Sequence, residues 1–217
     1  MAEGSAGQPL AVRGKAPSSV HLTFDAEHPN RPHHRGHGAD AVLDVLATHG
    51  VVATFFLQGR WASANPRLAG RIAQEGHTIG SHSNAHVRMT RLSDQGIAAE
   101  VRESQERIQE ATGVDPKPYF RCPYGDGHED PRVIALITGL QYRLVGWDVD
   151  PEDWNEGNDA AGLVAAVRAG LSGRSGRAPV VLLHTWPAHT SSTVQRVIEA
   201  YADDDVAWAP LPKQQLG

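Results

Sequence analysis

The sequence predicts an α/β fold and, within that class, a distorted (β/α) barrel with about seven parallel strands. Short β-branched runs alternate with segments of helical spacing along most of the 217-residue chain. Repeated strand–helix units favour a parallel sheet with right-handed crossovers. About seven such units suggest a closed or nearly closed barrel, and an open doubly wound sheet is the competing arrangement.

The expected strands are short, and most of them are followed by a helix. We place strands at residues 20–24, 51–57, 77–80, 118–121, 142–147, 179–183 and 206–211. Capping residues and glycines mark the helices between them. Asn65-Pro66, Ser93 and Asp130-Pro131 open helices, whereas Gly50, Gly76 and Gly113 close them. The expected helices span 39–49, 66–75, 94–112, 131–137, 159–171 and 192–201.

The chain divides into an N-terminal arm and one domain. Residues 1–18 are rich in Gly, Ala, Pro and Ser without periodicity, and we expect a flexible arm. No linker or internal repeat interrupts residues 19–217, which we expect to form a single domain. The arm lacks the apolar core of a secretory signal. We therefore expect a cytoplasmic protein in this form, or a secreted one if the sequence is a mature or truncated form.

Composition narrows the classes of partner. The formal net charge of -5 and the pI near 6.2 argue against nucleic acid as the main binding partner, because proteins usually bind nucleic acid through a positively charged surface. No apolar run of about 18 residues is present, so we expect no membrane span. The one cysteine, Cys122, excludes an intrachain disulfide and a Cys-rich metal site. The 12 histidines call for a chemical explanation.

Titratable side chains follow the predicted strands, where barrels place functional groups. His82 and His86 are spaced i, i+4, so both imidazoles can reach one ion. Two histidines with a carboxylate suit a divalent transition metal, most often zinc. Asp25 and Glu27 are two residues apart after the first strand and are expected on one face. One of these carboxylates can bind the metal while the other acts as base.

The segment Arg-Cys-Pro-Tyr combines groups that suit an acyl-transfer site. Arg121 offers a rigid fork for a carboxylate. Pro123 restricts the backbone, and the N–H of Tyr124 suits an oxyanion. We interpret Cys122 as a packing residue rather than a nucleophile.

His184 directly follows an apolar strand, so its surroundings are expected to be partly desolvated. Asp150 is the carboxylate that we expect to orient and charge it, which would make His184 a general acid near neutral pH. The alternative is a core histidine that is hydrogen-bonded to backbone.

Taken in order, these segments resemble the motifs of the polysaccharide deacetylase family (carbohydrate esterase family four). This family includes chitin, chitooligosaccharide and peptidoglycan N-acetylglucosamine deacetylases and acetylxylan esterases, and its fold is a distorted (β/α) barrel with fewer than eight units. Each segment alone is a weak indicator of the family, but five of them in the family's order over residues 23–184 are a specific one. The matching segments are Thr23-Phe24-Asp25, His82-Ser83-Asn84-Ala85-His86, Arg121-Cys122-Pro123-Tyr124, Asp150-Pro151-Glu152-Asp153-Trp154 and Leu182-Leu183-His184.

The resemblance implies a role for each matching residue. Asp25 matches the general base, Arg121 the residue that holds it, and Tyr124 the donor of the oxyanion N–H. His184 matches the general acid, with Asp150 tuning it. The metal ligands would be His82 and His86, and the substrate-binding residues would be Trp154 and Leu182, with Pro123 beside them.

The first motif departs from the family pattern. The family usually has a second Asp directly after the base, as the third metal ligand, and this chain has Ala26 there. We expect Glu27 to replace that ligand; the rival is a weakened site with two histidines and water. The His-rich segment 28–37 is expected to be a loop at the mouth of the site, rather than a source of metal ligands at His33, His34 or His37.

The predicted function is metal-dependent removal of acetyl groups from N-acetylated or O-acetylated carbohydrates by attack of a metal-bound water. One divalent ion is expected: zinc, with cobalt, manganese or nickel as alternatives. Three other functions stay open: a cyclic amide or imide hydrolase, a small-molecule biosynthetic deacetylase, and an inactive sugar-binding domain. The expected binding partner is an acetylated carbohydrate or a small N-acetyl substrate. We expect the protein to be a monomer or a simple homo-oligomer.

Overall fold

The computed structural model describes residues 16–28, 37–174 and 176–212. Most of the predicted arm, residues 1–15, lies outside this range, as do His33, His34 and the side chain of His37. At the end of the arm, Pro17 is buried and Ala16 packs against the main core. Within the described ranges, no helix is long and apolar enough to cross a membrane.

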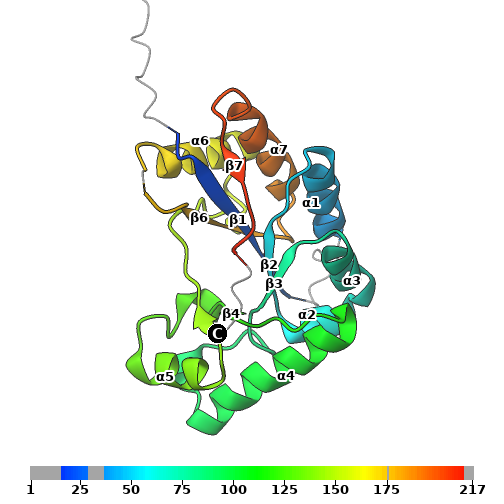
Figure 1. Cartoon of the computed structure of the whole chain (residues 1–217), viewed down its shortest axis with the longest axis vertical. Coiled ribbons are helices and arrows are strands. Elements are labelled where there is room, and N and C mark those ends of the chain that lie inside the picture. Colours follow the sequence, from blue (N-terminus) through cyan, green and yellow to red (C-terminus); the bar gives the residue numbers. More distant parts are fainter. Residues whose placement is uncertain (1–15, 29–36, 175, 213–217) are drawn as a thin grey trace, which may run out of the picture.

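Seven parallel strands form one sheet in the order β5-β4-β3-β2-β1-β6, with β7 paired to β1. The sheet curls into an incomplete barrel, as expected (Figure 1). Beyond β5, Val149 forms a parallel bridge with Val181 of β6, which brings the two edges together. The strands are β1 Ser19–Ala26, β2 Thr54–Leu57, β3 Thr78–Ser81, β4 Tyr119–Phe120, β5 Arg143–Leu144, β6 Val180–His184 and β7 Ala207–Trp208.

Helices follow most strands and lie outside the sheet (Figure 1). They are α1 His37–Thr48, α2 Gly59–Ala64, α3 Pro66–Gln74, α4 Asp94–Thr112, α5 Pro131–Gly139, α6 Ala160–Leu171 and α7 Thr190–Ala200. Two of the predicted N-caps accept hydrogen bonds from their helices: Ser93 from the N–H of Gly96 in α4, and Asp130 from the N–H groups of Arg132 and Val133 in α5. Gly113 ends α4 in the left-handed conformation. Asn65 precedes α3 as predicted, but its side chain makes no capping hydrogen bond and donates to the carbonyl of Trp61 instead. The sequence reasoning missed α2, a short helix between the expected strand and Asn65.

Successive side chains of β1 point alternately toward the core that the sheet shares with the helices and toward the barrel interior. Leu22, Phe24 and Ala26 are fully or almost fully buried in the main core with residues of the surrounding helices. At the other end of the barrel, the N–H of Leu211 donates to Thr54 Oγ1 at 2.9 Å, at the start of β2. Leu211 thus helps to fill the barrel at the N-terminal ends of the strands. The titratable residues predicted for the site lie at the opposite, C-terminal ends of the strands.

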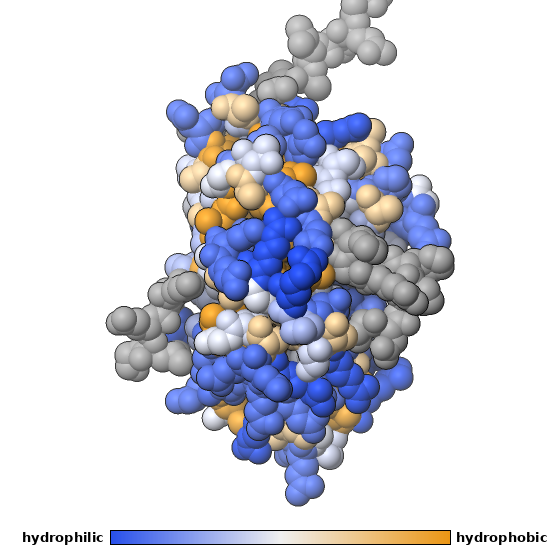
Figure 2. All heavy atoms as spheres, turned by 90° about the vertical axis from the view of Figure 1, so that its right-hand side faces the viewer, coloured by the Kyte–Doolittle hydropathy of each residue, from blue (hydrophilic) through white to orange (hydrophobic). Residues whose placement is uncertain are grey.

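The face seen in Figure 2 is the side on which α1 and α3 lie in Figure 1, and it is mostly hydrophilic. Ion pairs join these two helices: Arg71 of α3 contacts Asp40 at 3.0 Å and Asp44 at 2.7 Å on α1. Arg71 also contacts Glu75 at 2.7 Å. These side chains are partly or largely exposed, so the network covers the core helices without entering the core.

Candidate active site

A cavity of about 460 Å³ opens at the C-terminal ends of the strands. It brings together most residues that the sequence predicted for the site: Asp25, Glu27, His82, His86, Tyr124, Asp150, Trp154, Leu182 and His184. Arg121 is fully buried and does not line the cavity, but its guanidinium contacts Asp25, which does. Pro123 is also buried, and it is not among the lining residues that the structure describes. Its role in substrate binding therefore stays a prediction.

Asp25 and Arg121 form a buried ion pair. Nη1 of Arg121 donates to Asp25 Oδ1 at 2.8 Å, and their exposed fractions are 0% and 3%. The same guanidinium donates to the carbonyls of Val145 at 3.3 Å and Gly146 at 3.2 Å. It also stacks 4.0 Å from the ring centroid of Phe56. Arg121 thus holds the carboxylate of Asp25 in place. Burial lowers the pKa of Arg121, although Asp25 opposes this shift.

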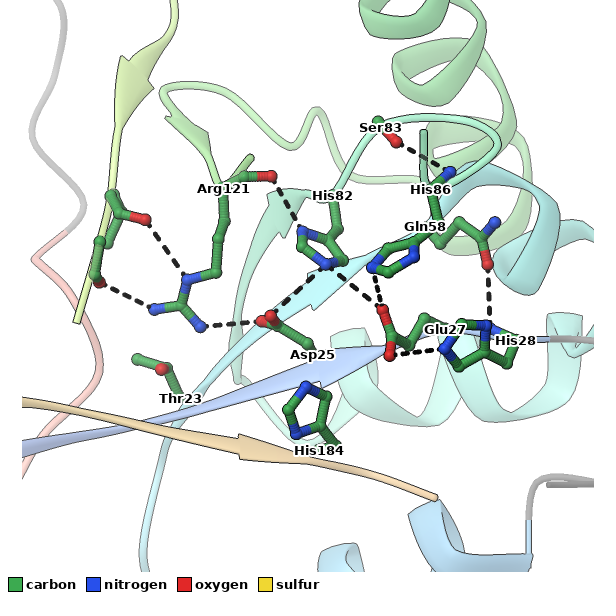
Figure 3. Close-up of polar contacts among 12 residues, drawn as sticks. Thr23, Asp25, Glu27, His28, Gln58, His82, Ser83, His86, Arg121 and His184 are labelled. Carbon is green, nitrogen blue, oxygen red and sulfur yellow. Dashed lines mark hydrogen bonds and ion pairs between the residues drawn. The ribbon is translucent and has the colours of Figure 1, made fainter. Parts of the chain in front are cut away.

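Glu27 lies among three histidines (Figure 3). Its Oε2 is 3.5 Å from His82 Nε2 and in close contact with His86 Nε2, while its Oε1 is 2.9 Å from His28 Nε2. Burial raises the pKa of Glu27, but its contacts with His28, His82 and His86 outweigh it and hold the pKa well below its usual value. Glu27 is therefore an ionised carboxylate on the same face as Asp25, as the alternation predicted.

The loop after β3 presents the two predicted histidine ligands. His82 Nδ1 donates to the carbonyl of Arg121 at 2.9 Å, so Nε2 is the nitrogen that faces the carboxylates and carries the lone pair when the ring is neutral. Burial lowers the pKa of His82, but the charges of Asp25 and Glu27 outweigh it and raise the pKa. His86 has a φ of +56°, and its N–H donates to Ser83 Oγ at 3.0 Å. Glu100 of α4 supports this turn, since its Oε2 accepts from the N–H of Asn84 at 2.9 Å.

This donor set fits a divalent metal. Donor atoms of Glu27, His28 and His86 lie within 4.8 Å of one another, and His82 Nε2 faces the same carboxylate. Glu27 Oε2 and His86 Nδ1 are buried and have no hydrogen-bond partner among the described residues. Burial lowers the pKa of His86 despite its contact with Glu27, so this ring is neutral at pH 7 and can act as a ligand.

His184 has a different carboxylate partner from the one predicted. Its Nδ1 is 2.7 Å from Asp153 Oδ1, and its backbone N–H donates to Asp153 Oδ2 at 2.8 Å. Burial lowers the pKa of His184, but the hydrogen bond and charge of Asp153 raise it to about 9. Asp150 lines the cavity nearby, but its Oδ1 accepts from the N–H of Glu152 at 2.8 Å. The expectation that Asp150 orients His184 is thus corrected to Asp153.

Asp25 and His184 are brought side by side by strand pairing. They are register partners of the neighbouring strands β1 and β6, and the N–H of Thr185 donates to the carbonyl of Asp25 at 3.0 Å. Parallel pairing in this register places both side chains at the mouth of the barrel. The base and acid predicted from distant motifs therefore share one cavity.

Aromatic and apolar side chains form the rest of the wall. Tyr124 has a φ of +58° and is 57% exposed, and its N–H makes no hydrogen bond within the described residues. Trp154 is 46% exposed, and Leu182 is buried at the cavity wall. Burial raises the pKa of the Cys122 thiol to about 12, which agrees with a packing role for this cavity-lining residue.

Sequence reasoning missed four residues of the site. Asp153 lies in the motif that begins at Asp150, and His28 directly follows Glu27, so their positions place both near the site without indicating which group each one contacts. Trp186 follows His184 by two residues and donates from Nε1 to Glu27 Oε1 at 3.2 Å. Trp147 lines the cavity from the segment after β5, and no chemical pattern marked it in the sequence.

Comparisons with known proteins agree with this geometry. Residues 13–145 match the family model described as polysaccharide deacetylase. A chitooligosaccharide deacetylase from Rhizobium leguminosarum bv. trifolii is 35% identical over 179 residues, which are 81% of this chain and 75% of that protein.

Solved structures give the same result. A family 4 carbohydrate esterase from Streptomyces lividans, in complex with acetate, aligns with a TM-score of 0.74 at 31% identity and covers 87% of this chain and 90% of that one. A family 4 pseudoenzyme from Bacillus anthracis aligns at 0.78 with 25% identity and covers 90% of this chain and 64% of that one. By its fold, its site and the extent of the family match, the chain belongs to the polysaccharide deacetylase family.

Proposed function

We propose that this chain is a metal-dependent hydrolase that removes acetyl groups from N-acetylated or O-acetylated carbohydrates. One observation carries the proposal: an anchored carboxylate, a carboxylate–histidine cluster and a histidine–aspartate pair open into a single cavity of about 460 Å³. The exposed rings of Tyr124 and Trp154 at this cavity suit the flat faces of a sugar. The similarity to a chitooligosaccharide deacetylase supports the same substrate class.

Each group has a role in the proposed hydrolysis. Asp25, held by Arg121, accepts a proton from the attacking water. The free N–H of Tyr124 donates to the oxygen that gains negative charge at the acetyl carbon. His184, charged by Asp153, gives a proton to the leaving amine or alcohol. A divalent ion held by Glu27, His82 and His86 would supply Lewis acidity and lower the pKa of water.

Metal analysis combined with acetate release tests this function. Purified protein is loaded with Zn²⁺, Co²⁺, Mn²⁺ or Ni²⁺ and offered chitooligosaccharides, peptidoglycan fragments, acetylxylan and small N-acetyl sugars. We expect about one ion per chain and acetate release that is lost on chelation and restored by the ion. Turnover of cyclic amides or imides without acetate release would refute the proposal.

An inactive sugar-binding domain is the second candidate, favoured by Ala26 and by the similarity to a family 4 pseudoenzyme. It predicts sugar binding without acetate release under any of the metals. The intact pairs Asp25–Arg121 and His184–Asp153 argue for the active form.

Glu27→Ala is expected to abolish stable metal binding, because it removes the only carboxylate that contacts both predicted histidine ligands in the described structure. The loss in Zn²⁺ affinity should exceed the roughly 10–100-fold that outer-shell changes cost. The matched control is Glu106→Ala, at an exposed position of α4. Full Zn²⁺ occupancy in Glu27→Ala, measured by metal analysis after dialysis, would favour the rival site of two histidines and water.

Asp153→Asn is expected to move the alkaline limb of the pH–rate profile to lower pH by about 1–3 units. The reason is that Asp153 raises the pKa of His184 to about 9, and the acid works only while His184 is protonated. The stability from this pair is likewise complete below about pH 6.5, and it is lost as the pH rises through about 9. Asp150→Asn is the control, and a larger shift there than in Asp153→Asn would reverse the assignment.

A further inference from the structure

The two oxygens of Glu27 have different kinds of neighbour (Figure 3). Oε2 faces His82 Nε2 at 3.5 Å and contacts His86 Nε2. Oε1 accepts from Trp186 Nε1 at 3.2 Å and lies 2.9 Å from His28 Nε2. An indole N–H can only donate a hydrogen bond. Oε1 therefore accepts hydrogen bonds, whereas Oε2 faces the predicted metal ligands.

His28 is built into the site rather than left in the following loop. It has a φ of +62°, a conformation that non-glycine residues rarely adopt. Its backbone N–H donates to Oε1 of the buried Gln58 at 3.1 Å, and Gln58 in turn donates its backbone N–H to the carbonyl of Ala26 at 3.0 Å. These contacts hold the ring of His28 beside the carboxylate of Glu27.

The rings of His28 and Trp186 also pack against each other. Their centroids are 5.9 Å apart at an interplanar angle of 67°, and His28 lies edge-on to His86 at 5.0 Å and 74°. Trp186 comes from the segment after β6, whereas His28 follows β1. The segments that follow the neighbouring strands β1 and β6 thus each supply a donor to the same oxygen, Oε1 of Glu27.

We propose that His28 and Trp186 are positioning residues that make Glu27 a one-oxygen metal ligand through Oε2. This inference rests on the proposed function, since it assumes an ion at Glu27, His82 and His86. A glutamate has one more rotatable bond than the aspartate whose place it would take, so its carboxylate needs more restraint. Two N–H donors on Oε1 supply that restraint and direct the remaining oxygen toward the histidines.

In this arrangement His28 is a hydrogen-bond donor to Glu27 and not a metal ligand. A nitrogen whose proton is donated to a carboxylate has no lone pair for a metal. His28 Nε2 shares Oε1 with Trp186, which cannot act as a ligand, whereas His82 and His86 face Oε2. Direct ligation by His28 is therefore the competing outcome, and it predicts a different response to a conservative substitution.

The test compares Zn²⁺ dissociation constants, obtained by chelator competition, in four proteins: wild type, His28→Ala, His28→Gln and Trp186→Phe. We expect His28→Ala and Trp186→Phe each to bind Zn²⁺ about 10–100-fold more weakly. His28→Gln keeps an N–H donor and should recover most of the loss. The visible absorption of bound Co²⁺ should keep the wild-type intensity in His28→Gln, because the ligand set is unchanged.

Matched controls are His49→Gln after α1 and Trp208→Phe in β7, which lie away from the cavity and should leave Zn²⁺ affinity unchanged. Two results would overturn the proposal: unchanged affinity in both His28→Ala and Trp186→Phe, or equal weakening in His28→Gln and His28→Ala with an altered Co²⁺ spectrum. A wild-type chain that binds neither ion would overturn the proposed function itself, which distinguishes the two failures.

Discussion

We expect Asp25→Asn to lower the rate of acetate release by about 10²–10⁴-fold, the usual contribution of a positioned general base. Asp25 Oδ1 is held by Arg121 at 2.8 Å, while Oδ2 is 3.4 Å from His82 Nε2 at the cavity. Asparagine keeps an acceptor for Arg121 but has no basic oxygen. The loss should therefore appear in kcat more than in KM.

The measurement pairs acetate release under saturating substrate with Zn²⁺ affinity and thermal unfolding of the same preparations. Zn²⁺ binding is expected to persist, because Glu27, His82 and His86 are unchanged. Asp44→Asn, at an exposed position of α1, is the matched control and should retain wild-type kcat. Near-wild-type turnover by Asp25→Asn would remove Asp25 from the role of base.

Arg121→Ala is expected to reduce the free energy of unfolding by about 3–5 kcal/mol, because breaking a buried pair leaves the carboxylate of Asp25 uncompensated. Both partners are nearly inaccessible to solvent, at 0% and 3% exposed. The change also leaves the carbonyls of Val145 and Gly146 without their guanidinium donor. Urea unfolding at pH 7 measures the loss.

Arg71→Ala is the matched control, because Arg71 makes more ion pairs than Arg121 but makes them at the surface. It contacts Asp40, Asp44 and Glu75, and each such pair is worth only about 0.2–1 kcal/mol. The number of ion pairs predicts a larger effect at Arg71, whereas burial predicts a larger effect at Arg121. Equal or greater destabilisation in Arg71→Ala would contradict the burial argument.

Local signals determined much of the fold. Ser93, Asp130 and Asp159 cap the helices that follow them, because their side chains accept N–H groups that have no partner inside the helix. The short helix α2 had no comparable signal: no side chain caps its start at Gln58. The expected strands at 118–121, 142–147 and 206–211 shorten to two residues each, since strand length depends on which neighbours pair.

The first motif shows what alternation alone can decide. Ala26 is fully buried in the core shared with the helices, whereas Asp25 and Glu27 both line the cavity. A two-residue period places these carboxylates on one face without any knowledge of the fold. Although this chain has Ala26 where the family usually has a second Asp, two carboxylates still lie at the cavity.

The partner of His184 shows what alternation cannot decide. Asp150 and Asp153 are both close to His184 in the motif order, and the sequence offered no reason to choose the second. The chain turns at Glu152, with a φ of +59°, so Asp150 binds the backbone of its own turn and Asp153 reaches His184. Only the path of this loop against β6 selects the partner.

The sequence by itself therefore determined the alternating fold, and it picked out Asp25, His184 and the pair His82 and His86 as candidates for base, acid and metal ligands, because these inferences depend on short-range periodicity and on residue type. The tertiary structure alone decided which groups meet: Asp153 with His184, and His28 and Trp186 with Glu27. The physical reason is that hydrogen bonds between loops depend on how neighbouring strands are paired and on how each loop leaves its strand. No spacing along the chain encodes that geometry.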